Sequence, residues 1–65
     1  MDNYDVLNDY MGNISEQYNI RQYSDNTFTI SAYIGKKHLS IEGSYDLVVM
    51  CVRHLYKELY YEEDF

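Results

Sequence analysis

The side chains with the most distinctive chemistry in this chain are one cysteine, Cys51, and two histidines, His38 and His54. Cys51 and His54 are three residues apart, a spacing that can place two side chains on one face of a helix. A tetrahedral zinc site usually needs four ligands, with such a pair occurring twice. The pair supplies half of that set, and we therefore expect no metal site and no cofactor.

The same side chains are the candidates for nucleophilic catalysis. A catalytic thiol is exposed and flanked by positive charge, whereas the apolar spacing around Cys51 predicts a buried position. Paired carboxylates could exchange protons only in a cleft that separates their pKa values. The sequence also has no glycine-rich phosphate loop, serine elbow or calcium loop. We expect the protein not to be an enzyme.

Acidic side chains are distributed unevenly along the chain, whose net charge is -6. Of the 11 acidic residues, all but three lie in residues 1–20 and 58–65, and all five basic residues lie between these segments. Self-repulsion of this kind does not stabilise a small fold, so the pattern suggests a surface that meets a cationic partner. It disfavours direct binding to nucleic acid, because phosphates would be repelled.

Length and cysteine content limit the fold and its location. The 65 residues are expected to form one small domain, residues 1–65, with an acidic C-terminal tail. A domain of this size leaves no room for a deep catalytic cleft. The single cysteine excludes an internal disulfide and favours the cytoplasm, of a host cell if the protein is phage-encoded. No apolar stretch approaches the roughly 20 residues of a bilayer span, so we expect no membrane contact.

Hydrophobic periodicity predicts a helix near each end of the chain. In the first, at about residues 3–18, apolar side chains recur every three or four positions, and Asp2 or Asn3 can cap the first turn. The second should cover about residues 45–60. The side chains that this second helix should bury are Tyr45, Val48, Cys51, Val52, Leu55 and Leu59.

Between the helices the pattern changes to the alternation that is typical of strands. We expect a short strand at residues 20–23, a long one at 27–34 and a third at 37–42, where Gly43 should end it. Turn-forming residues separate the three strands. This order predicts an α+β fold: a helix, a three-stranded antiparallel meander and a second helix, with both helices packed on one face of the sheet.

Acidic side chains form a row on the first predicted helix. Asp5, Asp9 and Glu16 share the face opposite Leu7 and Met11, and no basic residue interrupts them. Four residues of helix rise about 6 Å, close to the spacing of successive phosphates along a nucleic-acid strand. An ordinary solvated face or a tail that serves only solubility is the alternative. The acidic residues predicted to bind a partner are Asp2, Asp5, Asp9, Glu16, Glu58, Glu62, Glu63 and Asp64.

Tyrosine is unusually frequent, with nine residues in the chain. Tyrosine supplies rigid, amphipathic contact area and is enriched at interfaces. The second helix has a wider apolar band than one sheet face can cover, which predicts a further contact with the first helix or with a second copy of the chain. The predicted dimer contacts are Val49, Tyr56 and Tyr60, and the tyrosines predicted to meet another partner are Tyr4, Tyr60 and Tyr61.

Small size, acidic charge, many tyrosines and no catalytic motif together resemble one functional class, the phage-encoded host-takeover proteins that mimic DNA. This class includes inhibitors of restriction enzymes, of CRISPR effectors and of nucleoid proteins such as HU. The resemblance lies in composition and charge layout, and it implies that the protein occupies the nucleic-acid-binding surface of a basic host protein, often as a homodimer. The alternative is a small structural or adaptor protein with a tyrosine-rich contact.

Overall fold

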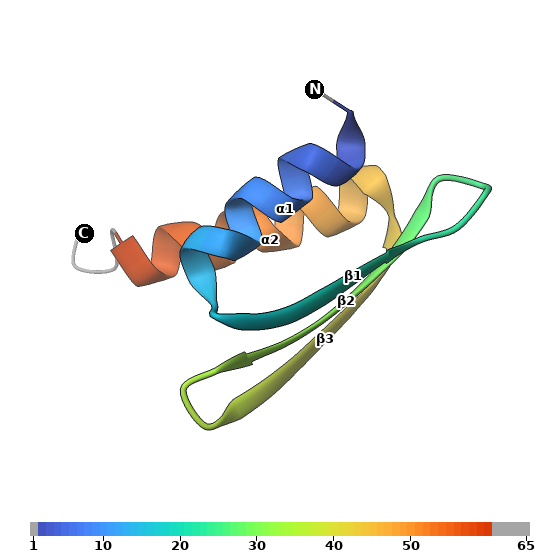
Figure 1. The fold of residues 1–65 in the computed structure, drawn as a ribbon. Helices are drawn as coiled ribbons and strands as arrows, with labels where there is room; N and C mark the ends of the chain where they lie inside the picture. The colour runs from blue at the N-terminus through green and yellow to red at the C-terminus, as the bar shows by residue number, and fades with distance from the viewer. Residues whose placement is uncertain (1, 61–65) are drawn as a thin grey trace.

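The computed structural model describes residues 2–60, which form two helices and one sheet. In chain order these elements are α1 (Asn3–Ile14), β1 (Gln17–Gln22), β2 (Thr27–Ile34), β3 (Lys37–Ser44) and α2 (Tyr45–Tyr60). The strands form an antiparallel meander in the order β1-β2-β3, and both helices cover the same face of it (Figure 1). The predicted α+β fold is confirmed.

The helix α1 begins where the sequence predicts, because Asp2 caps it. The Asp2 carboxylate accepts a hydrogen bond from the Asp5 backbone N–H at 2.9 Å, which satisfies one of the N–H groups that a first turn leaves without a partner. Leu7 and Met11, one turn apart, are fully buried against the sheet. Asp5 and Asp9 are exposed on the opposite side.

The end of α1 corrects the prediction, since the helix stops at Ile14 and does not reach Tyr18. Ser15 is buried in an extended conformation. Its hydroxyl accepts a hydrogen bond from the Gln17 N–H at 3.0 Å and is also bonded to the Tyr33 carbonyl oxygen. These bonds turn the chain into β1 three residues before the predicted start of that strand. Glu16 therefore lies between α1 and β1 and is not part of the helical row.

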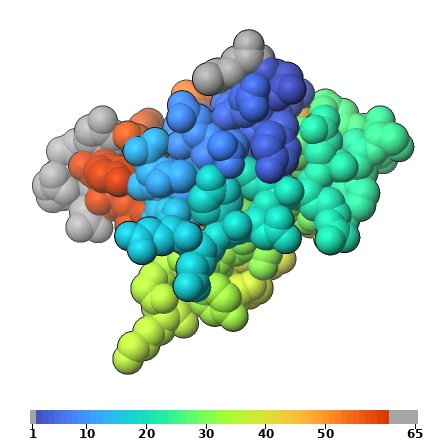
Figure 2. All heavy atoms as spheres, in the orientation of Figure 1, coloured from blue at the N-terminus to red at the C-terminus, as the bar shows by residue number. Residues whose placement is uncertain are grey.

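The core lies between the sheet and the two helices. Alternate residues of β2, namely Phe28, Ile30 and Ala32, are buried beneath the helices, and Ile20 of β1 lies beside Ile30 in the antiparallel register. Gly43 does not end β3 as predicted: it pairs with Phe28 and has a φ of 154°, and the strand continues to Ser44. The space-filling view shows α1 and β1 along the front of the molecule, with the turn between β2 and β3 projecting below (Figure 2).

The helix α2 has the predicted bounds but a different buried stripe. Val48 and Val52 are fully buried, whereas Cys51 is exposed and Leu59 is 42% exposed. The prediction that Cys51 and Leu59 belong to the core is therefore wrong. Because α2 packs against α1 as well as the sheet, its buried side is rotated toward Val49 and away from Cys51.

Candidate functional site

The exposed side of α1 carries two carboxylates without basic neighbours. Asp5 and Asp9 are one turn apart, and no residue of α1 is basic. Within residues 2–60 neither carboxylate has a basic group within 4.0 Å, and the one contact of this kind in that range joins His54 Nε2 to Glu58 Oε2 at 3.2 Å. We call Asp5 and Asp9 together the α1 acidic face.

The two acids of this face have different structural roles. Asp5 lies in the first turn of α1, where the positive end of the helix dipole stabilises a negative charge by a few tenths to about 1 kcal/mol. Asp9 lies further along the helix and gains little from the dipole, which acts mainly within the terminal turn. The Asp9 carboxylate makes no hydrogen bond or ion pair with the part of the chain that the structure describes. Stabilisation of the helix therefore does not explain why position 9 is acidic.

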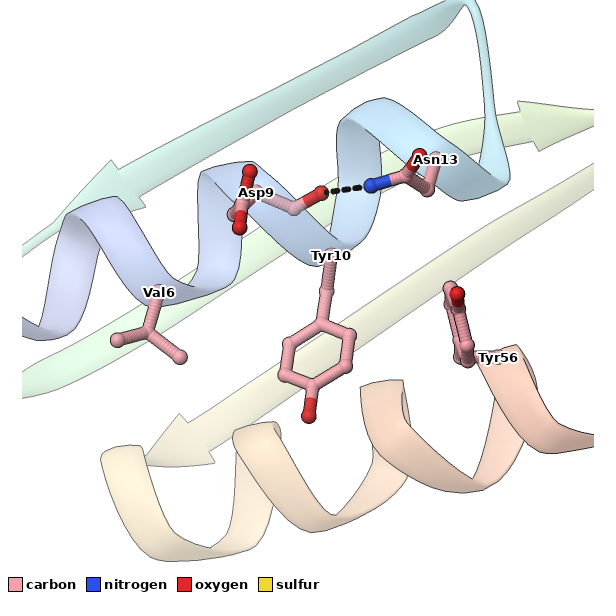
Figure 3. A pocket seen from close by; sticks show the side chains of 5 residues that line it. All are labelled: Val6, Asp9, Tyr10, Asn13 and Tyr56. Carbon is pink, nitrogen blue, oxygen red and sulfur yellow. Dashed lines mark hydrogen bonds between the residues drawn. The ribbon is translucent and has the colours of Figure 1, made fainter.

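A groove runs beside Asp9 between the two helices. Its volume is about 450 Å³, and Val6, Asp9, Tyr10, Asn13 and Tyr56 line it (Figure 3). Tyr10 extends from α1 toward α2, and Tyr56 rises from α2 to meet it. Their ring centroids are 5.7 Å apart with the planes at 73°, the favourable edge-to-face arrangement of two aromatic rings.

Tyrosines and an asparagine hold the far end of this groove. The Tyr56 ring lies 4.7 Å from the Tyr60 ring, and the Tyr60 hydroxyl donates a hydrogen bond of 2.6 Å to the Asn13 carbonyl oxygen. That carbonyl belongs to the last turn of α1, where the helix itself supplies no donor. The Asn13 side-chain amide donates to the Asp9 carbonyl oxygen at 2.8 Å. The walls of the groove are therefore fixed by contacts within one chain.

The residues predicted to form a dimer interface lie on α2, the helix that packs against α1. Val49 packs on the core, and Tyr56 and Tyr60 contact α1. The predicted further contact of α2 is thus made at least in part with the first helix. A contact with a second copy of the chain stays a prediction.

The other predicted partner-binding residues are spread over the molecule. Asp2 caps α1, and Tyr4 is 37% exposed on that helix. Glu16 lines a separate hollow beside the turn between β2 and β3, and Glu58 pairs with His54 on α2. The structure joins none of these side chains to the groove. Tyr61, Glu62, Glu63 and Asp64 lie outside the described residues.

One pair of reactive side chains was missed by the sequence analysis. Ser31 Oγ lies 2.9 Å from His38 Nε2 on the sheet face that the helices leave open, and the His38 ring also meets the Tyr33 ring at 4.9 Å. The pairing of Tyr33 with His38 in the sheet brings these residues together, and only the exact register could have indicated it. Within residues 2–60 no acceptor orients the other ring nitrogen, as a serine–histidine nucleophile requires.

Two further findings concern the described range alone. No three His, Cys, Asp or Glu side chains between residues 2 and 60 are close enough together to hold a metal ion. None of the helices in that range has the length and apolar character needed to cross a membrane.

The groove residues Val6, Tyr10 and Asn13 were not predicted as a site. The signal that could have revealed them is topological. Three strands separate the helices, so α1 and α2 run in the same direction and their C-terminal halves lie side by side (Figure 1).

Comparisons with protein-family models, with curated proteins and with solved structures find no match to this chain.

Proposed function

We propose that this protein binds a basic nucleic-acid-binding protein through the α1 acidic face and thereby blocks that protein's contact with nucleic acid. It acts by stoichiometric binding and not by catalysis, in the cytoplasm of the cell that contains the target. The observation that carries the proposal is the pair Asp5 and Asp9, exposed one turn apart on a helix without basic residues. Their separation along the helix is about 6 Å, near the spacing of neighbouring phosphates.

The negative charge of the protein bears on both the rate and the affinity of the proposed binding. The net charge of -6 attracts a basic surface over long range and accelerates encounter. Exposed charge pairs add little affinity by themselves. The groove supplies the complementary element, because aromatic side chains such as Tyr10 and Tyr56 are frequent centres of binding energy.

The test is a salt titration against purified proteins. A panel would contain the nucleoid protein HU, a restriction endonuclease and a CRISPR effector, with hen egg-white lysozyme as a basic protein that has no nucleic-acid-binding role. Affinity for at least one nucleic-acid-binding member should fall by about tenfold or more between about 50 and about 300 mM salt. Lysozyme should bind more weakly than that member.

Two results would count against the proposal. One is binding that is independent of salt. The other is equal binding of lysozyme and the nucleic-acid-binding proteins, which would indicate bulk charge attraction without any imitation of phosphate spacing.

The second candidate function is that of a small adaptor protein. It is favoured by apolar side chains on α2 that remain accessible, Leu47 at 47% and Met50 at 62%. In that case Met50→Lys would abolish partner binding, whereas Asp9→Asn would leave it unchanged. The phosphate-imitating function predicts the reverse.

A further inference from the structure

We infer that the groove between α1 and α2 receives an arginine side chain of the basic partner, with its guanidinium against the Tyr10 and Tyr56 rings and paired with the Asp9 carboxylate. This inference rests on the proposed function, because it names the group that the partner presents to α1. It adds a defined contact to what is otherwise a general attraction between charges.

The dimensions of the groove allow a side chain to enter. Its volume of about 450 Å³ compares with about 30 Å³ for one water molecule in the liquid. Two of the residues that line it, Asp9 and Asn13, are exposed. A long side chain from a partner that lies along α1 therefore finds space without moving the backbone.

The charge of the groove selects a cation. Asp9 is the one charged residue among the five that line it. Arg53 and Lys57 of α2 line a different hollow, together with Met50 and His54. Neither of these bases pairs with Asp9 in the described structure. The Asp9 carboxylate is therefore available to a cation from outside the chain.

The aromatic walls favour arginine over lysine. A guanidinium is planar, is weakly hydrated, stacks on aromatic faces and can donate two parallel hydrogen bonds to one carboxylate. Lysine offers a compact, strongly hydrated charge that uses the same walls less well. Tyr10 and Tyr56 line the same groove as Asp9, so a guanidinium on a long side chain can contact a ring while it pairs with the carboxylate.

The site is largely organised before a ligand arrives. The Tyr56 ring contacts the rings of Tyr10 and Tyr60, and the Tyr60 hydroxyl is in turn bonded to the Asn13 carbonyl oxygen. Side chains that are fixed in advance lose less conformational freedom on binding. An exposed carboxylate alone would bind a cation weakly, and the preformed tyrosine walls are what distinguish Asp9 from Asp5.

The test measures binding of fluorescent hexa-arginine and hexa-lysine peptides at low salt. The matched variants are Asp9→Asn and Asp5→Asn, which each remove one exposed charge from α1, although only Asp9 lines the groove. We expect Asp9→Asn to weaken hexa-arginine binding by about tenfold or more, and Asp5→Asn by less than about threefold. Hexa-lysine should bind several-fold more weakly than hexa-arginine, and backbone amide NMR signals of residues 6–13 and 56 should shift with arginine.

The outcomes separate this inference from the proposed function. Equal losses for the two variants, or NMR shifts away from the groove, would overturn the arginine site and leave the charge-driven function in place. No binding of hexa-arginine at millimolar concentration would also overturn it. The opposite combination is also possible. If hexa-arginine binds in the groove but binding of the protein panel does not depend on salt, the arginine site stands and the proposed function is refuted.

Discussion

Gly43 provides a sharp test of the fold, because the structure places it inside β3 where the sequence pattern predicted a strand end. Its φ of 154° lies in a region that residues with a Cβ rarely adopt. A Cβ added there would lie 2.7 Å from Leu47 Cδ2 and 3.5 Å from Leu47 Cγ. Gly43→Ala therefore strains the backbone and also forces the Leu47 side chain to move.

The loss of stability expected for Gly43→Ala is the sum of two terms, the backbone strain and the close contact with Leu47. Forcing an alanine into a sparsely populated backbone region costs about 1–3 kcal/mol. Leu47 is half exposed, so its side chain can rotate away at a cost of about 0.5–1.5 kcal/mol. We expect Gly43→Ala to lower the free energy of unfolding by about 2–4 kcal/mol, a large part of the about 3–10 kcal/mol typical of a domain this small.

The assay is urea unfolding followed by far-ultraviolet circular dichroism, with the other two glycines as controls. Gly35 has a φ of 64° and open space around its Cβ position, so Gly35→Ala should cost only about 1 kcal/mol. Gly12 lies in α1, and its added Cβ would be 3.6 Å from Tyr18 Oη, an ordinary contact. Gly12→Ala should therefore stabilise the protein by up to about 1 kcal/mol.

A double variant separates the two terms at Gly43. Leu47→Ala removes the close contact but not the backbone strain, so the Gly43→Ala and Leu47→Ala changes should couple by about 1 kcal/mol. A loss for Gly43→Ala no greater than that for Gly35→Ala would refute the reasoning. It would mean that β3 ends at Glu42 and that Gly43 is a turn residue, as the sequence pattern predicted.

Three further predictions concern residues whose roles the structure defines. Asp2→Ala should lower the urea-unfolding free energy by about 1 kcal/mol and Asp2→Asn should not, because asparagine also caps helices; equal losses would contradict the cap. Ser15→Ala should cost about 1–3 kcal/mol in the same assay, since it leaves the part-buried Gln17 N–H without its hydrogen bond, and an unchanged midpoint would exclude that role. Cys51 should react with a thiol reagent in the native protein as fast as an exposed cysteine does; protection that is lost only on unfolding would restore the predicted buried position.

The elements with strong local signals were predictable from the sequence. Alternation in residues 27–34 and three-to-four spacing in residues 45–60 each fit one kind of structure, and the bounds of β2 and α2 agree with them. Tyr18 fits both patterns, since it follows Ile14 at helical spacing and precedes Ile20 at strand spacing. Pairing with β2 and the hydrogen bonds of Ser15 decide in favour of the strand, and neither can be read from local periodicity.

The candidate site was only partly predictable. Asp5 and Asp9 follow from helical spacing and the absence of basic residues in α1, and both are exposed as expected. The groove depends on α1 lying beside α2, which rotates the buried stripe of α2 toward Tyr56 and away from Cys51. A periodicity argument treats each helix alone. It therefore predicted that Cys51 is buried, which is wrong, and it did not identify Tyr10 as a residue of the groove.

Displacement of DNA from a basic protein tests the central claim most directly. Labelled duplex DNA bound to HU, or to another member of the panel that binds the protein, would be titrated with wild-type protein and with two double charge reversals. These are Asp5→Lys with Asp9→Lys, and a control of equal charge change, Asp25→Lys with Glu42→Lys, at exposed positions outside α1. The account predicts that wild type and control release the DNA at near-equimolar amounts and that the α1 reversal does not. Release by the α1 reversal at the wild-type concentration, or DNA that stays bound at saturating wild-type protein, would contradict it.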